Sequence, residues 1–178
     1  GVAGYRGFYY HFLDLDTGER FRDVELSTID TTLLLAGALF SASYFDRATP
    51  VEREVRAAAE ELYRRADWSF FWVRPPRIAH GWTPEEGYIV SDWHGYDEAM
   101  ILVLLALGSP THPVPAEAWS AYQSSARTGA FHGPETLVFG PLFGHQYAHV
   151  WVDFRGLRDA ASEARGFDYF EASRRAAY

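Results

Sequence analysis

Two acidic side chains stand next to each other at the start of the most apolar segment of the chain. Asp97 and Glu98 follow Tyr96, and every residue in 99–107 is apolar. A helix that is apolar on all sides is normally buried all round, so this segment predicts a central helix with two carboxylates at its N-terminal end. A carboxylate partly withdrawn from water has a raised pKa, as a general acid requires. The alternative is that the two acids only stabilise the positive end of the helix dipole.

Two other apolar segments also carry polar groups near their start. A helix is expected over residues 27–45, with Ser27 as its N-cap and Asp30 as its only charged residue. Like the central helix, it is expected to be buried on all faces. Residues 142–152 form the third apolar segment, which is also expected to be one helix and carries His145 and His149.

The two histidines of the third segment have the i, i+4 spacing of a zinc-binding helix, which places both on one face. The zinc protease motif requires a Glu where this chain has Gln146, and the sequence suggests no third ligand. His145 and His149 are therefore expected to line a pocket or to form hydrogen bonds in the core. No metal and no cofactor are predicted.

A more polar segment, expected to form surface helices, follows each apolar segment. The sequence Thr49-Pro50-Val51-Glu52 combines an N-cap, a proline at the first helical position and a capping-box glutamate, so a surface helix should begin there. Further surface helices are expected over residues 116–126, 157–165 and 167–178, the last two separated by Gly166.

This alternation of inner and outer helices predicts an all-α fold, an α/α toroid in which stacked hairpins form part of an (α/α)6 barrel. Asp30, Glu98 and His145 would then gather at one end of the toroid. Short β or extended pieces are expected in the long loops, at residues 5–14, 69–73 and 88–90. Residues 1–178 are expected to be a single domain and about half of a longer one, so the rest of that domain would be a partner.

Composition limits the classes of function. A formal net charge of −8 with mixed charges argues against nucleic-acid binding, and no apolar run reaches the ~18 residues of a membrane span. Without cysteine, disulfides and thiolate metal sites are excluded. Aromatic residues make up 17% of the chain, which favours a carbohydrate ligand because one ring offers an apolar face and a polar edge. The alternative is that the surplus aromatics fill the core.

Five segments carry a family resemblance that covers nearly the whole chain. Together they are similar to the glycoamylase-like family, which includes bacterial endo-β-1,2-glucanases and the C-terminal region of cyclic β-1,2-glucan synthases. The segments are RGFYYHFLD (6–14), ELSTIDTTLLLAGALF (25–40), GYDEAMILVLLALGSPTHPVP (95–115), FGPLFGHQYAHVWVDFRG (139–156) and GFDYFEASRRA (166–176).

The resemblance implies an (α/α)6 barrel that cleaves a glycosidic bond with two carboxylates, with either retained or inverted configuration. Glu98 would be the general acid and Asp30 the second essential carboxylate, which either activates the attacking water or holds the sugar while the base lies in the rest of the domain. Asp97 stands where Asn is expected in many relatives. The family domain is roughly twice as long as this chain and contributes further acidic groups, so the fragment alone is expected to be incomplete. The family context also implies a bacterial envelope or exported protein.

The expected substrate is an oligosaccharide or polysaccharide, specifically a β-1,2-glucan cut by endo-hydrolysis. Two alternatives are a glucan-transferring domain and a carbohydrate-binding domain without catalysis, and a zinc-binding helical domain is a third. The candidate substrate-binding residues comprise four aromatic rings, one acid and two side chains for sugar hydroxyls: Tyr10, Trp82, Trp93, Tyr96, Asp97, His145 and Gln146.

Overall fold

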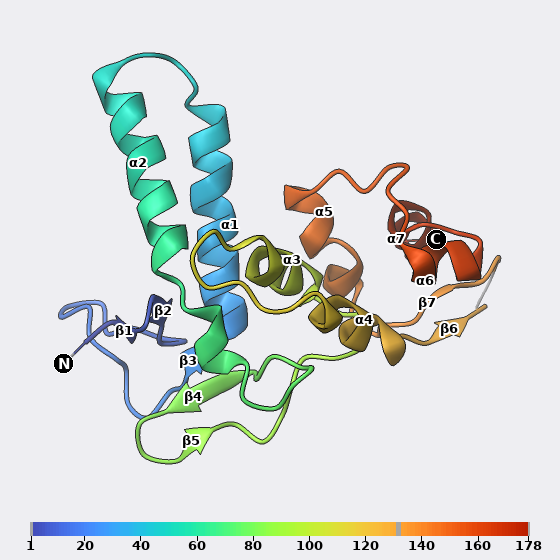
Figure 1. Cartoon of the computed structure of the whole chain (residues 1–178), viewed down its shortest axis with the longest axis horizontal. Helices are drawn as coiled ribbons and strands as arrows, with labels where there is room; N and C mark the ends of the chain where they lie inside the picture. Colours follow the sequence, from blue (N-terminus) through green and yellow to red (C-terminus); the bar gives the residue numbers. More distant parts are fainter. Residues whose placement is uncertain (1, 131–132, 178) are drawn as a thin grey trace.

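The computed structural model describes residues 2–130 and 133–177, and most of its regular structure is helical (Figure 1). Gly1, residues 131–132 and Tyr178 lie outside the described residues, so the end of the helix expected over 167–178 does too. The elements in chain order are β1 (Gly4–Tyr5), β2 (Phe8–Tyr9), β3 (Leu26–Ser27), α1 (Thr28–Tyr44), α2 (Pro50–Arg65), η1 (Trp68–Phe71), β4 (Gly81–Thr83), β5 (Gly87–Tyr88), α3 (Met100–Gly108), α4 (Glu117–Ser124), β6 (Thr128–Gly129), β7 (Thr136–Leu137), η2 (Leu142–His145), α5 (Tyr147–Trp151), α6 (Ala160–Arg165) and α7 (Tyr169–Ala176).

The first two helices form an antiparallel hairpin at one end of the molecule (Figure 1). The Ser27 side chain accepts a hydrogen bond from the Asp30 N–H at 3.2 Å, and Thr49 does the same for the Glu52 N–H at 3.2 Å. These side chains satisfy backbone donors that have no partner inside a helix, so both helices start where the sequence predicts.

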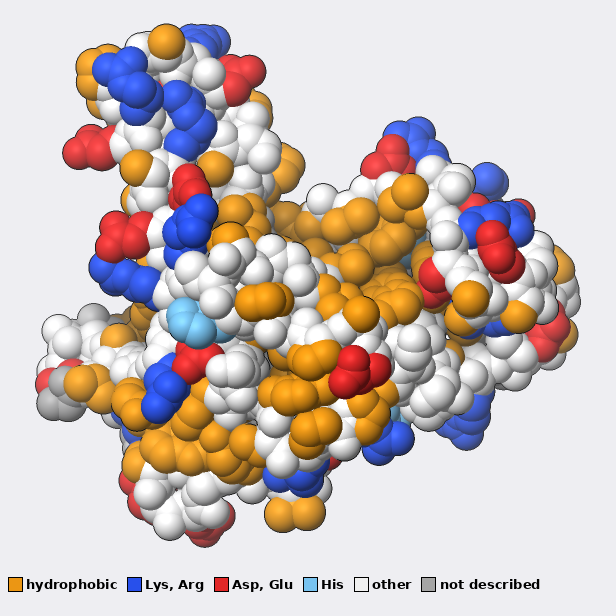
Figure 2. Space-filling view, in the orientation of Figure 1, with side chains coloured by type: hydrophobic (Ala, Val, Ile, Leu, Met, Phe, Trp, Pro, Cys, Tyr) orange, Lys and Arg blue, Asp and Glu red, His pale blue; other side chains and the backbone are white. Residues whose placement is uncertain are grey.

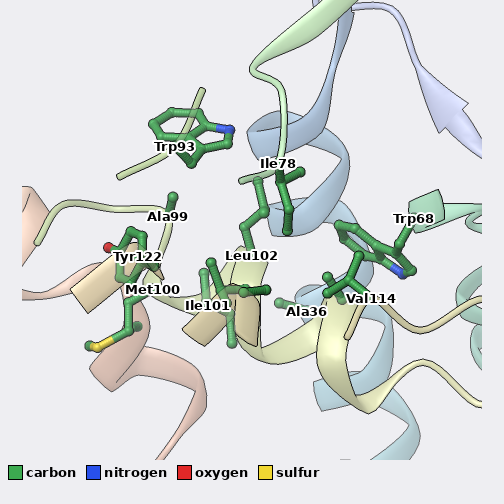
Figure 3. Close-up of a cluster of buried hydrophobic side chains, with 14 of the residues drawn as sticks. Ala36, Trp68, Ile78, Trp93, Ala99, Met100, Ile101, Leu102, Val114 and Tyr122 are labelled. Carbon is green, nitrogen blue, oxygen red and sulfur yellow. The ribbon is translucent and has the colours of Figure 1, made fainter. Parts of the chain in front are cut away.

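Helix α3 is the centre of the core, as its composition predicts. Its buried side chains pack against α1, α4 and α5, and they meet Trp68 from η1 and Ile78 from the loop after it (Figure 3). The helix begins at Met100, so Asp97 and Glu98 lie in the turn ahead of it rather than in its first turn.

Helix α1 is not buried on all faces, which corrects the expectation from its composition. Leu34, Phe40 and Tyr44 are exposed, and Figure 2 shows hydrophobic side chains gathered in the hollow between the α1–α2 hairpin and the part formed by α5–α7. The Phe40 ring meets that of Trp151 from α5 edge-on at 6.1 Å. The apolar surface of α1 is therefore only partly covered by the described residues.

The expected single helix over residues 142–152 is wrong. The chain forms the short 3-10 turn η2 and then α5, separated at Gln146, whose φ is −115°. Gly144 packs directly against the Phe139 ring, which occupies the place of a Cβ. A glycine lowers helix stability by its backbone entropy, and this packing holds the chain in the tighter turn instead.

The strands are short and antiparallel, and they hold the loops to the helical core. In the three-stranded sheet the order is β3–β4–β5, with Leu26 opposite Trp82. The strand expected over residues 5–14 is reduced to the β1–β2 hairpin and two isolated bridges, from Tyr10 to Leu26 and from Leu13 to Arg20. Of the other two expected β pieces, residues 69–73 form most of η1, whereas residue 88 ends β5.

The outer helices are confirmed, although the one expected over residues 157–165 begins only at Ala160. Asp159 and Asp168 each begin a helix through a capping box, and Gly166 ends α6 with a left-handed φ of 79°. Helix α4 lies within the expected range 116–126. Among the described residues, every helix is too short or too polar to cross a bilayer.

Candidate active site

The segment ahead of α3 joins the N-terminal ends of the three apolar segments. The Trp93 indole N–H donates a hydrogen bond of 2.9 Å to Thr28 Oγ1 at the start of α1. Three residues later, the Tyr96 ring lies 5.1 Å from the ring of His145, measured between centroids. This segment continues directly into Asp97 and Glu98.

Asp97 is held by hydrogen bonds. Its Oδ1 accepts from the Tyr122 hydroxyl at 2.8 Å and from the Ala99 N–H at 2.8 Å. Burial raises the pKa of the Asp97 carboxyl to about 6, and the neighbouring Glu98 carboxylate adds to this increase, while the hydrogen bonds oppose it. Asp97 thus shapes the turn ahead of α3.

Glu98 differs from its neighbour in its contacts. The side chain is half-buried, and within the described residues it makes no side-chain hydrogen bond or ion pair. A half-buried carboxylate at the start of a dry helix, with its oxygens not engaged by the protein, is available to a ligand.

Asp30 lies in the first turn of α1, where the Ser27 hydroxyl donates to its Oδ2. The same oxygen is 3.5 Å from His11 Nε2, and the other ring nitrogen of His11 is 2.8 Å from Glu25 Oε1. The side chain of Asp30 is 43% exposed, so water or a ligand can reach it.

Sequence reasoning did not place His11 and Glu25 beside Asp30. Both residues lie in segments that carry the family resemblance, but they are 14 positions apart. Their backbones pair, with the His11 N–H donating to the Glu25 carbonyl at 2.9 Å. The pairing of residues 8–11 with residues 24–27 places them together, and the turn residues at 14–20 do not by themselves set that register.

Three of the four predicted stacking rings belong to the core. The exposed fractions are 7% for Tyr10, 9% for Trp93 and 4% for Tyr96, so none presents an open ring face, and we propose no stacking role for them. Arg20 covers the ring of Tyr10 at 4.8 Å. Trp82 is half-buried and stacks on Tyr5 at 5.8 Å.

His145 is buried and His149 is half-buried, so this pair is poorly accessible to a ligand. His145 is 3% exposed and its Nε2 is 3.0 Å from the Phe139 carbonyl, so the Nε2–H donates there. Burial lowers the pKa of His149. Gln146 is exposed and remains accessible to a ligand. In the described part of the chain, no group of three or more His, Asp or Glu residues is arranged to hold a metal ion.

A cavity of about 680 Å³ lies between η2 and α7. Phe139, His145 and Arg174 are among its lining residues, but neither Glu98 nor Asp30 lines it. The cavity is therefore separate from the two candidate catalytic carboxylates.

The segment that carries the two acids lies within a match to a known protein family. A sequence model of the Glycoamylase family, described as "Putative glucoamylase", matches residues 90–178, which is half of the chain and includes Glu98. The chain belongs to the Glycoamylase family. Within this Glycoamylase chain, the matched half also contains Asp97 and His145, whereas Asp30 lies outside it.

Individual relatives resemble this Glycoamylase chain over almost its whole length. The exo β-1,2-glucooligosaccharide sophorohydrolase (non-reducing end) of Parabacteroides distasonis is 21% identical over 206 residues, covering 97% of the chain and 28% of the hydrolase. A "putative glucoamylase" from Bacteroides fragilis is 26% identical with a TM-score of 0.84, covering 96% of the chain and 43% of that protein.

A third relative is an endo-β-1,2-glucanase from Chitinophaga pinensis, solved with sophorotriose and glucose. It is 22% identical with a TM-score of 0.81, and the match covers 95% of the chain and 43% of the glucanase. At this identity the likeness shows the shared fold. The chain spans less than half the length of each of these three relatives.

Proposed function

We propose that the protein is a glycoside hydrolase that acts on a β-glucan, specifically by endo-hydrolysis of β-1,2-glucan. The observation that carries this proposal is the contrast between Asp97 and Glu98. Asp97 is held by Tyr122 and Ala99, whereas the adjacent Glu98 makes no side-chain hydrogen bond within the described residues. Asp97 stabilises the turn ahead of α3, and the Glu98 carboxyl is free to act in the reaction.

In the proposed reaction, Glu98 is the general acid and donates a proton to the glycosidic oxygen. Asp30 is the second carboxylate and activates a water on the opposite face of the sugar. The exposure of Asp30 supports this role, since the attacking water must reach it. The accessible side chains of Gln146 and Trp82 would contact the sugar.

The architecture proposed for the whole domain is an (α/α)6 toroid. The hairpin α1–α2 and the central packing of α3 support it, as do the hydrophobic side chains that remain exposed on α1. In that toroid residues 1–178 would supply about half of the helices, and the rest of the domain would contribute further acidic groups to the cleft.

The names of the relatives support β-1,2-glucan as the substrate. The Parabacteroides distasonis relative is named as an exo-acting sophorohydrolase, and the Chitinophaga pinensis relative as an endo-glucanase whose structure holds sophorotriose. Both names concern β-1,2-linked glucose, but they differ in the mode of attack. Endo attack is thus the finer part of the proposal and requires its own measurement.

The test uses the protein in its full natural length, incubated with linear β-1,2-glucan and, as a control, with soluble starch. Products are sized at early and late times. Short oligosaccharides of mixed length at early times, from β-1,2-glucan alone, are the expected result. Release of disaccharide only would refute the endo mode, and products longer than the substrate would indicate glucan transfer. Binding without any new product would refute hydrolysis.

A further inference from the structure

A histidine lies between two carboxylates at the edge of the proposed site. His11 Nδ1 is 2.8 Å from Glu25 Oε1, and His11 Nε2 is 3.5 Å from Asp30 Oδ2. The ring also stacks on Phe12, with centroids 4.3 Å apart and an interplanar angle of 14°. Backbone pairing with Glu25 and stacking on Phe12 together fix the direction of the imidazole.

The contact with Glu25 determines which ring nitrogen carries the proton. A carboxylate can only accept, so the neutral ring places its proton on Nδ1 and donates it to Glu25. The lone pair of Nε2 is then directed toward Asp30. At 3.5 Å this second contact is longer than a hydrogen bond, and such contacts often shorten when a substrate binds.

The two oxygens of Asp30 have different surroundings. Oδ2 faces His11 Nε2 and accepts from the Ser27 hydroxyl, whereas Oδ1 makes no side-chain hydrogen bond with a described residue. One oxygen is thus held by the protein, and the other is left for a water molecule.

We propose that His11 is a positioning residue for the hydrolytic reaction: it orients Asp30 and takes over the proton that Asp30 removes from the attacking water. This inference rests on the proposed function, and it specifies Asp30 as a base rather than a nucleophile. Among the described residues, the charged groups that face the ring are Glu25 and Asp30.

The proposed step balances in protons and bonds. Asp30 takes one proton from water as the water oxygen bonds to the anomeric carbon, and the glycosidic oxygen leaves with the proton of Glu98. The Asp30 carboxyl then turns its protonated oxygen toward His11, the proton passes to His11 Nε2, and Glu25 stabilises the imidazolium. Solvent later removes this proton from His11, whose side chain is 37% exposed, and returns one to Glu98.

The first test is chemical rescue of His11→Ala, with β-1,2-glucan as the substrate. We expect kcat to fall about 10²-fold with KM within about twofold of wild type, because a proton-transfer group is lost rather than a binding group. Added imidazole should restore part of kcat in His11→Ala but not in Asp30→Asn. The control is His112→Ala, an exposed histidine far along the chain, which should keep wild-type kcat with or without imidazole.

Two results would overturn the inference. One is wild-type kcat in His11→Ala, and the other is a folded His11→Ala, with an unchanged melting temperature, that imidazole does not rescue. A wild-type protein that cleaves no glucan would instead refute the proposed function, and with it the proton step.

Nitrogen-15 spectra of the histidine rings test the arrangement without relying on activity. In wild type the neutral His11 ring should carry its proton on Nδ1, and Glu25→Ala should shift it to Nε2, the tautomer preferred in water. A wild-type ring protonated on Nε2 would contradict the pairing itself.

Discussion

The Tyr122 hydroxyl and the Asp97 carboxyl form a buried pair that fixes the turn ahead of α3. The hydroxyl donates to Asp97 Oδ1 at 2.8 Å and accepts from the Asp97 backbone N–H at 3.0 Å. Tyr122 is 1% exposed and comes from α4, 25 positions away. Because Asp97 is clamped at both its side chain and its backbone, the direction of the next residue, Glu98, is set by α4 as well as by α3.

The Asp97 carboxyl should make stability depend on pH between about 4 and 6. Its pKa is raised to about 6 in the folded chain, mainly by burial, against about 3.9 in an unfolded chain. Between these values the folded state binds the proton more tightly, so the free energy of unfolding decreases as pH rises. Asp97→Asn keeps the oxygen acceptor and removes the charge, so its stability relative to wild type should rise by about 2–3 kcal/mol from pH 4 to pH 7.

Urea unfolding of both proteins at pH 4, 5, 6 and 7 measures this difference. Asp46→Asn is the matched control, since Asp46 is exposed just beyond the end of α1 and should show no such change across the range. If the free energy of unfolding of Asp97→Asn changed with pH in parallel with that of wild type, the buried carboxyl would not contribute to the pH dependence of stability.

Replacing Glu98 should abolish most of the proposed activity without unfolding the protein. Glu98→Gln keeps the shape but cannot donate a proton, so kcat on β-1,2-glucan should fall by about 10²–10⁴-fold. A nitrophenyl glycoside should be affected much less, because its leaving group needs no proton. Kinetics on both substrates measure the contrast.

The control for this variant is Glu86→Gln, in the turn between β4 and β5, where the side chain is exposed. Its kcat should equal that of wild type on both substrates. Equal losses of Glu98→Gln on glucan and on the nitrophenyl glycoside would assign Glu98 to binding or structure instead of acid catalysis.

The β1–β2 hairpin, which ends two residues before His11, depends on a glycine at its turn. Gly7 has φ of 81°, and a Cβ there would collide with the backbone carbonyl of Arg65 at the end of α2. Gly18 also has a positive φ, of 69°, but nothing lies within 4 Å of its Cβ position. Gly18→Ala should therefore lower the free energy of unfolding only by the cost of a left-handed backbone at a residue with a Cβ, about 1–2 kcal/mol. Gly7→Ala should lower it by about 3 kcal/mol or more.

Chemical denaturation of the two alanine variants compares these costs directly. Similar losses of stability in Gly7→Ala and Gly18→Ala would mean that the hairpin moves away from α2 without cost. In that case the β1–β2 hairpin would not be held by α2.

The helix boundaries set by caps were predictable because their causes are local, whereas the break of the third apolar segment at Gln146 was not. Ser27 and Thr49 cap the helices that follow them, and Gly166 ends α6, each through contacts within a few residues along the chain. The burial of α3 was equally predictable, since a segment without polar side chains has no face to leave in water. The family resemblance also followed from the sequence alone, and the match over residues 90–178 confirms it.

Long-range packing decided which candidates can reach a ligand. Tyr10 and Trp93 have the composition of sugar-stacking residues, yet Arg20 covers the ring of Tyr10 and Trp93 is bonded to Thr28. The exposure of an aromatic ring depends on residues far away in the sequence, so the residue type alone cannot predict whether the ring reaches a ligand. For the same reason, the full burial expected for α1 was wrong.

The sequence by itself determined the caps that begin α1 and α2, the burial of α3 and the two acids just ahead of it. Only the tertiary structure distinguished Asp97 from Glu98, through Tyr122, and brought His11 between Glu25 and Asp30. Caps and apolar runs act over three or four residues and are visible in the linear order. Hydrogen bonds that span 14 or 25 positions exist only once the strands and helices have packed.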